Sequence, residues 1–137
     1  MYMKTIWSIW LVLLALSVTG ICAAEIPDLV GNWAGKGPGY NEETGYVVDS
    51  DNILNFSITE QKGRLFNGEL TYNLNGTDVV EGFAGTISPD NKTFYIAEFI
   101  SGYDVGTVVS EDEIDLMYLL EGKAGAVFIE TLRRIAV

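Results

Sequence analysis

Apolar and polar side chains alternate along short segments after residue 25, and no stretch there keeps the 3.6-residue spacing of an amphipathic helix. Alternation with a period of two is typical of β-strands that have one face in a core and the other in water. We therefore predict eight strands: Leu29–Lys36, Ile53–Gln61, Arg64–Leu74, Asp78–Ile87, Thr93–Ile100, Val105–Ser110, Glu113–Leu120 and Ala124–Arg133.

The connections between the later strands are short and rich in Gly, Asn and Asp, as at Asn75-Gly76. These residue types tolerate the backbone angles of tight hairpin turns. Strands joined by short hairpins pair with their sequence neighbours, so the chain is expected to form an up-and-down antiparallel meander. Eight such strands can close into a barrel, which removes unpaired edges. The expected fold is an all-β, eight-stranded antiparallel barrel formed by residues 25–137 as one domain.

One connection, Gly37–Asn52, is much longer than the others. Connections longer than about 12 to 15 residues are usually either functional or mobile. This one carries Tyr40, Tyr46 and four carboxylates, and we interpret it as a lid over one end of the barrel. A loose acidic surface loop is the alternative.

Strand alternation also predicts which side chains point into the barrel. With Trp33 inside, the inward residues of the next three strands are Leu54, Phe56, Ile58, Phe66, Leu70, Tyr72, Leu74, Phe83 and Ile87. Glu81 and Glu98 share faces with inward phenylalanines. Each could accept a hydrogen bond from a ligand. Because a buried unpaired carboxylate is costly, both are expected to lie near the open mouth, to be neutralised, or to be paired with a cation.

The later segments 94–100, 114–120 and 126–132 are apolar on both faces. A strand of this kind is usually covered on both sides. The favoured interpretation is a homo-oligomer in which a second copy packs on the outer face. The alternatives are another protein at the cell surface, or a monomer with scattered surface hydrophobics.

Residues 1–24 have the order of a secretory signal peptide, with Lys4 near the start, the apolar run Ile6–Val18 and small residues at the end. We expect cleavage before Glu25, and a location outside the cell or on its surface. The alternative is an uncleaved anchor, because the apolar stretch approaches the roughly 20 residues that span a bilayer.

Charge and composition exclude several classes of function. Eight Lys and Arg against nineteen Asp and Glu give a net charge of -11, so no basic surface is available for nucleic acid. The chain has no His and one Cys, which excludes Ser-His-Asp and Cys-His catalysis and zinc sites built on these residues. The acidic clusters Asp49-Ser50-Asp51 and Glu111-Asp112-Glu113 lack the pattern of a calcium-binding EF-hand loop. We expect no metal and no cofactor.

Two motifs connect the pattern with a known superfamily. Gly31-Asn32-Trp33 is a Gly-x-Trp motif on the first strand, and the last strand ends in Arg133-Arg134. With eight meander strands and a long first connection, the chain resembles the calycins, which comprise lipocalins, fatty-acid-binding proteins and avidins. The resemblance implies that Trp33 closes one barrel end beneath an arginine of the last strand, a cation–π contact. Adjacent residues of a strand face opposite sides, so either Arg133 or Arg134 fills this role. The later-strand tryptophans of the avidin biotin site are absent.

The expected function is binding of a small or partly apolar ligand in the barrel mouth, without catalysis. The alternative is a structural or protein-interaction module whose barrel is filled by its own side chains. Paired carboxylates also occur in glycoside hydrolases, but acidic residues are abundant enough here to explain such pairs. Candidate ligand-binding residues are Tyr40, Tyr46, Phe56, Tyr72, Glu81, Phe83 and Glu98. Asn-x-Ser/Thr sequons make Asn55, Asn75 and Asn91 candidate glycosylation sites.

Overall fold

The computed structural model describes residues 24–48 and 52–136. The expected signal segment lies outside the described residues except for Ala24, and so do positions 49–51 of the expected lid.

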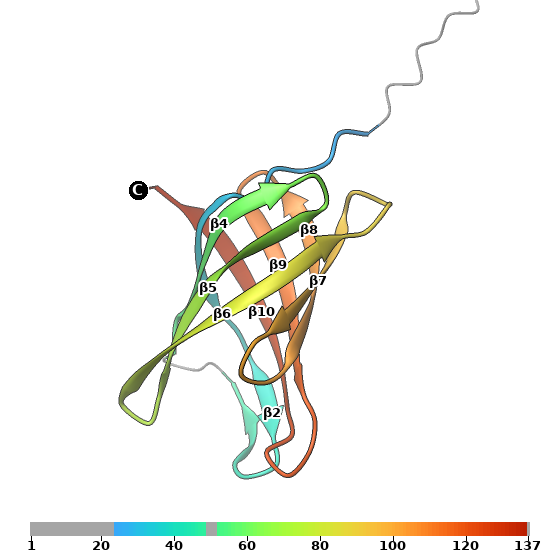
Figure 1. Ribbon diagram of the computed structural model, residues 1–137. Coiled ribbons are helices and arrows are strands. Elements are labelled where there is room, and N and C mark those ends of the chain that lie inside the picture. Colours follow the sequence, from blue (N-terminus) through green and yellow to red (C-terminus); the bar gives the residue numbers. More distant parts are fainter. Residues whose placement is uncertain (1–23, 49–51, 137) are drawn as a thin grey trace, which may run out of the picture.

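Within the described residues, ten strands form one antiparallel sheet (Figure 1). They are β1 (Gly31–Lys36), β2 (Gly39–Asn41), β3 (Gly45–Val47), β4 (Leu54–Lys62), β5 (Leu65–Leu74), β6 (Thr77–Ile87), β7 (Thr93–Glu98), β8 (Tyr103–Ser110), β9 (Glu113–Leu120) and β10 (Ala126–Ile135). The eight longer strands follow the order β1-β4-β5-β6-β7-β8-β9-β10, and β1 also pairs with β10. The expected eight-stranded up-and-down barrel is confirmed.

The barrel closes through the first strand. Trp33 of β1 lies opposite Arg134 of β10 on one side and opposite Phe56 of β4 on the other. Turns 63–64, 88–92 and 111–112 meet at one end, called here the upper end, together with both described chain ends (Figure 1). Turns 75–76, 99–102 and 121–125 meet at the other, the lower end.

The connection 37–52 differs from the expected lid. Its described part forms the hairpin β2–β3, and β2 pairs with the lower part of β10, with Gly39 opposite Phe128. The hairpin turn is held by Asn41, whose Oδ1 accepts a hydrogen bond of 2.7 Å from the Thr44 backbone N–H. Strands β2 and β3 have three residues each, which is too short for an alternation of apolar and polar residues to be recognised in the sequence. Residues 39–47 therefore lengthen the barrel wall below β1.

An apolar core fills the upper and middle parts of the barrel. Phe56 and Phe83 pack with ring centroids 5.0 Å apart, and Phe66 lies 6.4 Å from Phe83 and 6.0 Å from Phe94. Full burial of such a side chain stabilises the fold by about 1.5–3 kcal/mol. Seven of the nine predicted inward residues are buried. Tyr72 is partly buried, and Leu74 is 56% exposed because β5 and β6 continue past the barrel wall to their turn.

Two glycines make room for this aromatic core. Gly85 lies opposite Phe66 and Gly106 lies opposite Phe94 in neighbouring strands. A Cβ atom at either position would come within 2.2 Å of the opposing ring. The rings therefore lie over the glycine backbone, an arrangement known to support curved sheets.

Candidate ligand-binding site in the lower barrel

The upper end of the barrel is sealed. The Trp33 side chain is buried and donates a hydrogen bond of 3.0 Å from Nε1 to the Leu29 carbonyl oxygen. The Arg134 guanidinium lies 4.2 Å from the Trp33 ring centroid and donates to the carbonyl oxygens of Val30 and Asp28. Arg133 points outward and forms an ion pair of 3.0 Å with Glu113. Of the two arginines, Arg134 is the one that covers the indole.

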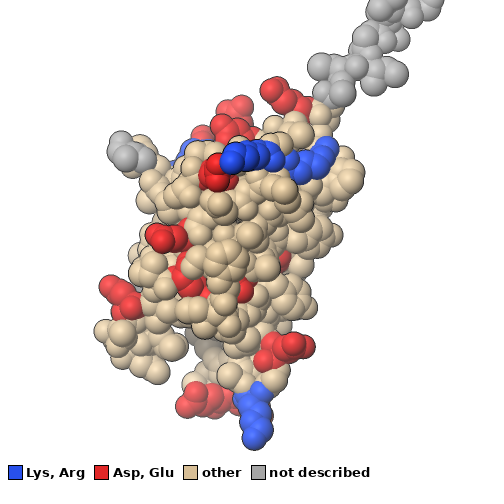
Figure 2. Space-filling view, in the orientation of Figure 1, with Lys and Arg blue, Asp and Glu red and all other residues tan. Residues whose placement is uncertain are grey.

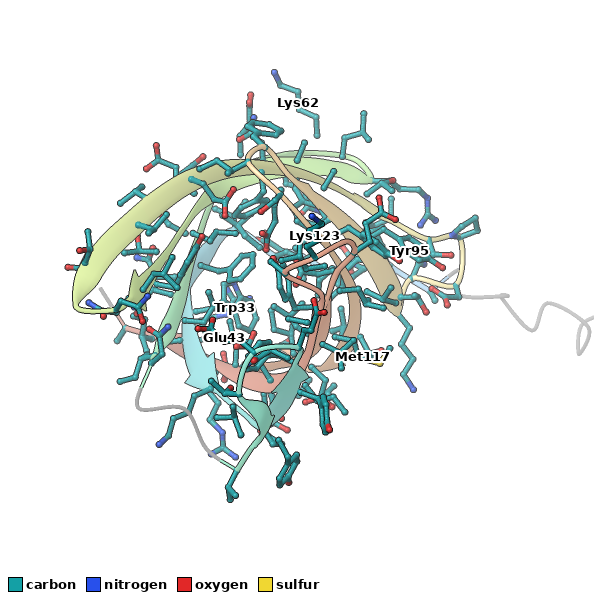
Figure 3. The ribbon with its side chains drawn as sticks, turned by 90° about the horizontal axis from the view of Figure 1, so that it is seen from below. Trp33, Glu43, Lys62, Tyr95, Met117 and Lys123 are labelled. Atoms are coloured by element: carbon teal, nitrogen blue, oxygen red, sulfur yellow. The ribbon has the colours of Figure 1, made fainter. Side chains whose placement is uncertain are left out.

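The lower half of the barrel interior is polar. Each of the six consecutive strands from β5 to β10 contributes one ionisable side chain on the face that also carries core residues. In strand order they are Tyr72, Glu81, Glu98, Asp104, Tyr118 and Glu130. We call this set the inner acidic cluster. Seen from below, Trp33 lies deep inside the ring of strands, whereas Tyr95 and Met117 lie on its outside (Figure 3).

Burial disfavours ionisation of this cluster. It raises the pKa of Glu98 to about 9, with a further contribution from the neighbouring Asp104 and Glu81 carboxylates. Burial also raises the pKa of Asp104 to about 7, and that of Glu130 to about 7, where the Asp104 carboxylate adds to the effect. The pKa of Tyr118 is raised to about 12, mainly by burial and then by Glu98. The interior therefore holds carboxyl groups that retain protons near neutral pH.

Asp104 is the least satisfied member of the cluster. It is 1% exposed, and both of its carboxylate oxygens lack a hydrogen-bond partner among the described residues. The adjacent Glu98 carboxyl group can donate to it only while it is protonated. Glu81, in contrast, has a fixed partner, because its Oε2 accepts a hydrogen bond of 2.9 Å from the Ile100 N–H.

The lower end is also open to water. Four inward side chains are only partly buried, although they lie on the same strand faces as fully buried core residues. They are Tyr72, Glu98, Tyr118 and Phe128. The Tyr118 and Phe128 rings lie near each other, with centroids 6.5 Å apart. This end therefore combines partly exposed ring surfaces with the partly exposed Glu98 carboxyl group, and the other three carboxyl groups are buried behind them.

The predicted ligand-binding residues fall into three groups. Tyr72, Glu81 and Glu98 meet in the inner acidic cluster. Phe56 and Phe83 are fully buried in the core above it. Tyr40 and Tyr46 lie apart from both groups: they are 59% and 65% exposed and face each other across β2–β3, and Tyr40 lies in register with the outward Val127.

Sequence reasoning missed Asp104, Tyr118 and Glu130. The predicted strand began at Val105, so Asp104 was placed outside it, whereas β8 begins at Tyr103 and turns Asp104 inward with Gly106. Tyr118 shares a face with Ile114 and Leu116, and Glu130 shares one with Leu132. The same alternation that located Glu81 also applies to these residues.

The sequons occupy different surroundings. Asn55 is exposed on β4, and Asn75 is exposed in the β5–β6 turn with a φ of 52°. Asn91 is partly buried, and its Nδ2 donates a hydrogen bond of 2.6 Å to the Ala24 carbonyl oxygen. A glycan on Asn91 would modify this nitrogen atom, so Asn55 and Asn75 are the more accessible positions.

The outer wall carries a second feature. Two neighbouring rows of outward side chains cross strands β7 to β10, with one residue from each strand in each row. The first row consists of Tyr95, Val105, Met117 and Ile129, and the second of Ala97, Tyr103, Leu119 and Val127. These eight residues, called here the outer apolar face, include no charged side chain. An open groove of about 360 Å³ adjoins it, lined mainly by outward residues of β6–β8 such as Ala84, Thr86 and Tyr95. In Figure 2, Lys and Arg appear only near the two ends of the visible surface.

Among the described residues, no group of three or more Asp, Glu, His or Cys side chains has the arrangement needed to hold a metal ion. Across 24–48 and 52–136, no helix is long and apolar enough to cross a membrane.

Comparison of the chain with family models, curated proteins and solved structures finds no match. The closed barrel is compatible with the calycin fold on its architecture alone.

Proposed function

We propose that this protein is an exported, non-enzymatic barrel of calycin type that binds a small, partly apolar molecule in its lower end. The observation that carries the proposal is the contrast between the two ends. The upper interior is filled by apolar side chains beneath Trp33 and Arg134. The lower interior holds ionisable side chains and partly exposed rings. A barrel that served only as a scaffold would gain stability from apolar residues at these positions.

Ligand-observed NMR with a library of small fragments tests this proposal. We expect some fragments to bind, and a Glu98→Phe variant to lose them, because a bulky ring would fill the lower entrance beside Tyr118. Ala97→Phe is the matched control, since it adds the same ring on the outward face of the same strand. Thermal melts of both variants check that they fold.

Two results would contradict the proposal. Fragment signals that persist in Glu98→Phe would place binding outside the barrel. Signals lost only in Ala97→Phe would assign binding to the outer groove, which Ala97 helps to line.

The outer apolar face supports a second candidate, self-association of this chain. Contiguous apolar patches are uncommon on soluble monomers. With a net charge of -11, two copies repel over most of their surface, so a charge-free face is where they can approach most closely. The proposed occupant of this face is therefore a second copy of the chain.

Light scattering coupled to gel filtration tests self-association. We expect the unaltered chain to form a dimer or higher oligomer, and Met117→Lys to convert it to a monomer, because the charge would be buried in the centre of the interface. Asn67→Lys, on the exposed outer side of β5, is expected to leave the oligomer intact. An unaltered chain that is monomeric at every concentration would contradict this candidate.

A further inference from the structure

Among the residues that the structure describes, the inner acidic cluster has no buried cationic partner. It contains four carboxyl groups, Glu81, Glu98, Asp104 and Glu130. In the part of the chain that the structure describes, no Lys or Arg side chain is buried. Arg134 lies at the sealed end with Trp33, and Lys123 lies exposed in the turn between β9 and β10. Acidic groups gathered without a basic partner create a negative potential inside the barrel once they ionise.

Asp104 is the residue at which a positively charged group of a ligand would bind. Its oxygens are buried, and among the described residues only the protonated Glu98 carboxyl group can donate to them, whereas Glu81 accepts from the Ile100 N–H. Buried charges in proteins are normally paired, because an unpaired one loses its hydration without compensation. A positively charged N–H donor at Asp104 would supply both the hydrogen bonds and the charge that the protein itself leaves out.

The surroundings favour an organic cation over a metal ion. The carboxyl groups come from four different strands, and among the described residues no three acidic side chains converge as metal ligands. Aromatic rings accompany them at the same end, namely Tyr72, Tyr118 and Phe128. Ring faces attract ammonium groups and also cover the apolar body of a ligand.

We propose that the ligand is a small organic amine, bound as its ammonium ion. Its charged nitrogen lies at Asp104 and Glu98, and its apolar or aromatic body packs against Tyr118 and Phe128. This inference rests on the proposed function. The two alternatives, a neutral ligand and a metal ion, are distinguished by the experiment below.

Calorimetric titration of the full chain with 2-phenylethylamine, 2-phenylethanol and 3-phenylpropanoate compares a cation, a neutral molecule and an anion of similar shape. We expect the amine to bind at least about ten-fold more tightly than the alcohol, and the carboxylate to bind most weakly. Asp104→Asn should weaken the amine about ten-fold or more and leave the alcohol unchanged. Glu69→Gln, on the exposed face of β5, is the matched control and should change neither.

The pH dependence gives a second readout. The groups that face the bound nitrogen are Tyr72, Glu81, Glu98, Asp104, Tyr118 and Glu130. A bound cation favours the deprotonated forms of Glu98, Asp104 and Glu130, whose pKa values burial raises. Asp104, with a pKa of about 7, is mostly protonated at pH 6 and mostly ionised at pH 8. Amine affinity should therefore rise about ten-fold between pH 6 and pH 8, with release of protons on binding.

Each other outcome overturns the inference. If the alcohol binds as tightly as the amine, the barrel binds a neutral ligand, and the proposed function survives without the cation. If none of the three probes binds while fragments still occupy the lower end, the ligand class is wrong. Binding of Mn²⁺ that Asp104→Asn abolishes would assign the site to a metal. Loss of all fragment binding would remove the proposed function as well.

Discussion

Replacing Trp33 by alanine is expected to lower the free energy of unfolding by about 3–5 kcal/mol. The side chain is among the largest that are fully buried, and its removal leaves a cavity where β1, β4 and β10 meet. It also removes the hydrogen bond to Leu29 and the contact with Arg134. Small domains are stable by only about 5–15 kcal/mol, so this loss is a large fraction of the total. Urea unfolding followed by far-ultraviolet circular dichroism measures it.

The two neighbouring arginines provide the control for this prediction. Arg134→Met is expected to cost about 1–3 kcal/mol, because it leaves the carbonyl oxygens of Val30 and Asp28 without their donor. Arg133→Met removes only an ion pair in which the arginine is itself largely exposed, and should cost less than about 1 kcal/mol. Equal costs for the two variants would show that Trp33 is not held from above by Arg134.

Raising the pH from about 5 to about 9 is expected to lower the free energy of unfolding by at least about 3 kcal/mol, which is the contribution of a single carboxyl group with a folded pKa of about 7. The pKa values of Glu98, Asp104 and Glu130 are about 9, 7 and 7 in the folded chain. Unfolded Asp and Glu have values of about 3.9 and 4.3. The folded state thus binds more protons between these limits. Its stabilisation is complete below about pH 4 and is lost as the pH rises through the folded values.

Urea unfolding at several pH values measures this slope. Asp104→Asn should flatten it, because one of the three titrating groups is removed, and should stabilise the protein at alkaline pH. Glu69→Gln, which removes an exposed carboxylate of β5, should leave the slope unchanged. Stability that increases from pH 5 to pH 9 would contradict the assignment of these groups to the interior.

The fold could be predicted largely because the early strands alternate clearly. In β4 the burial alternates from Leu54 to Ile58 as the sequence pattern does. Short turns then required neighbouring strands to pair, and closure followed from the number of strands. The hairpin β2–β3 could not be predicted in this way, because its pairing with β10 is a long-range interaction that three-residue strands do not reveal.

The candidate site was only partly predictable for a related reason. Glu81 and Glu98 occur in strands with a clear apolar face, so alternation placed them inside. Strand β9 is apolar on both faces near its end, so the alternation that places Tyr118 on the face of Ile114 and Leu116 is less distinct than in β6 and β7. The choice between Arg133 and Arg134 likewise depends on the register of β1 with β10, which pairs Trp33 with Arg134.

The placement of both described chain ends at the upper end has a practical consequence. Ala24 contacts Asn91 there, and Ile135 pairs with Asn32 at the start of β1. An affinity tag or a fused reporter attached directly before Ala24 or after Ala136 would therefore begin at the end of the barrel opposite the turn 121–125 (Figure 1). Immobilised protein should retain free diffusion of small molecules to its lower entrance.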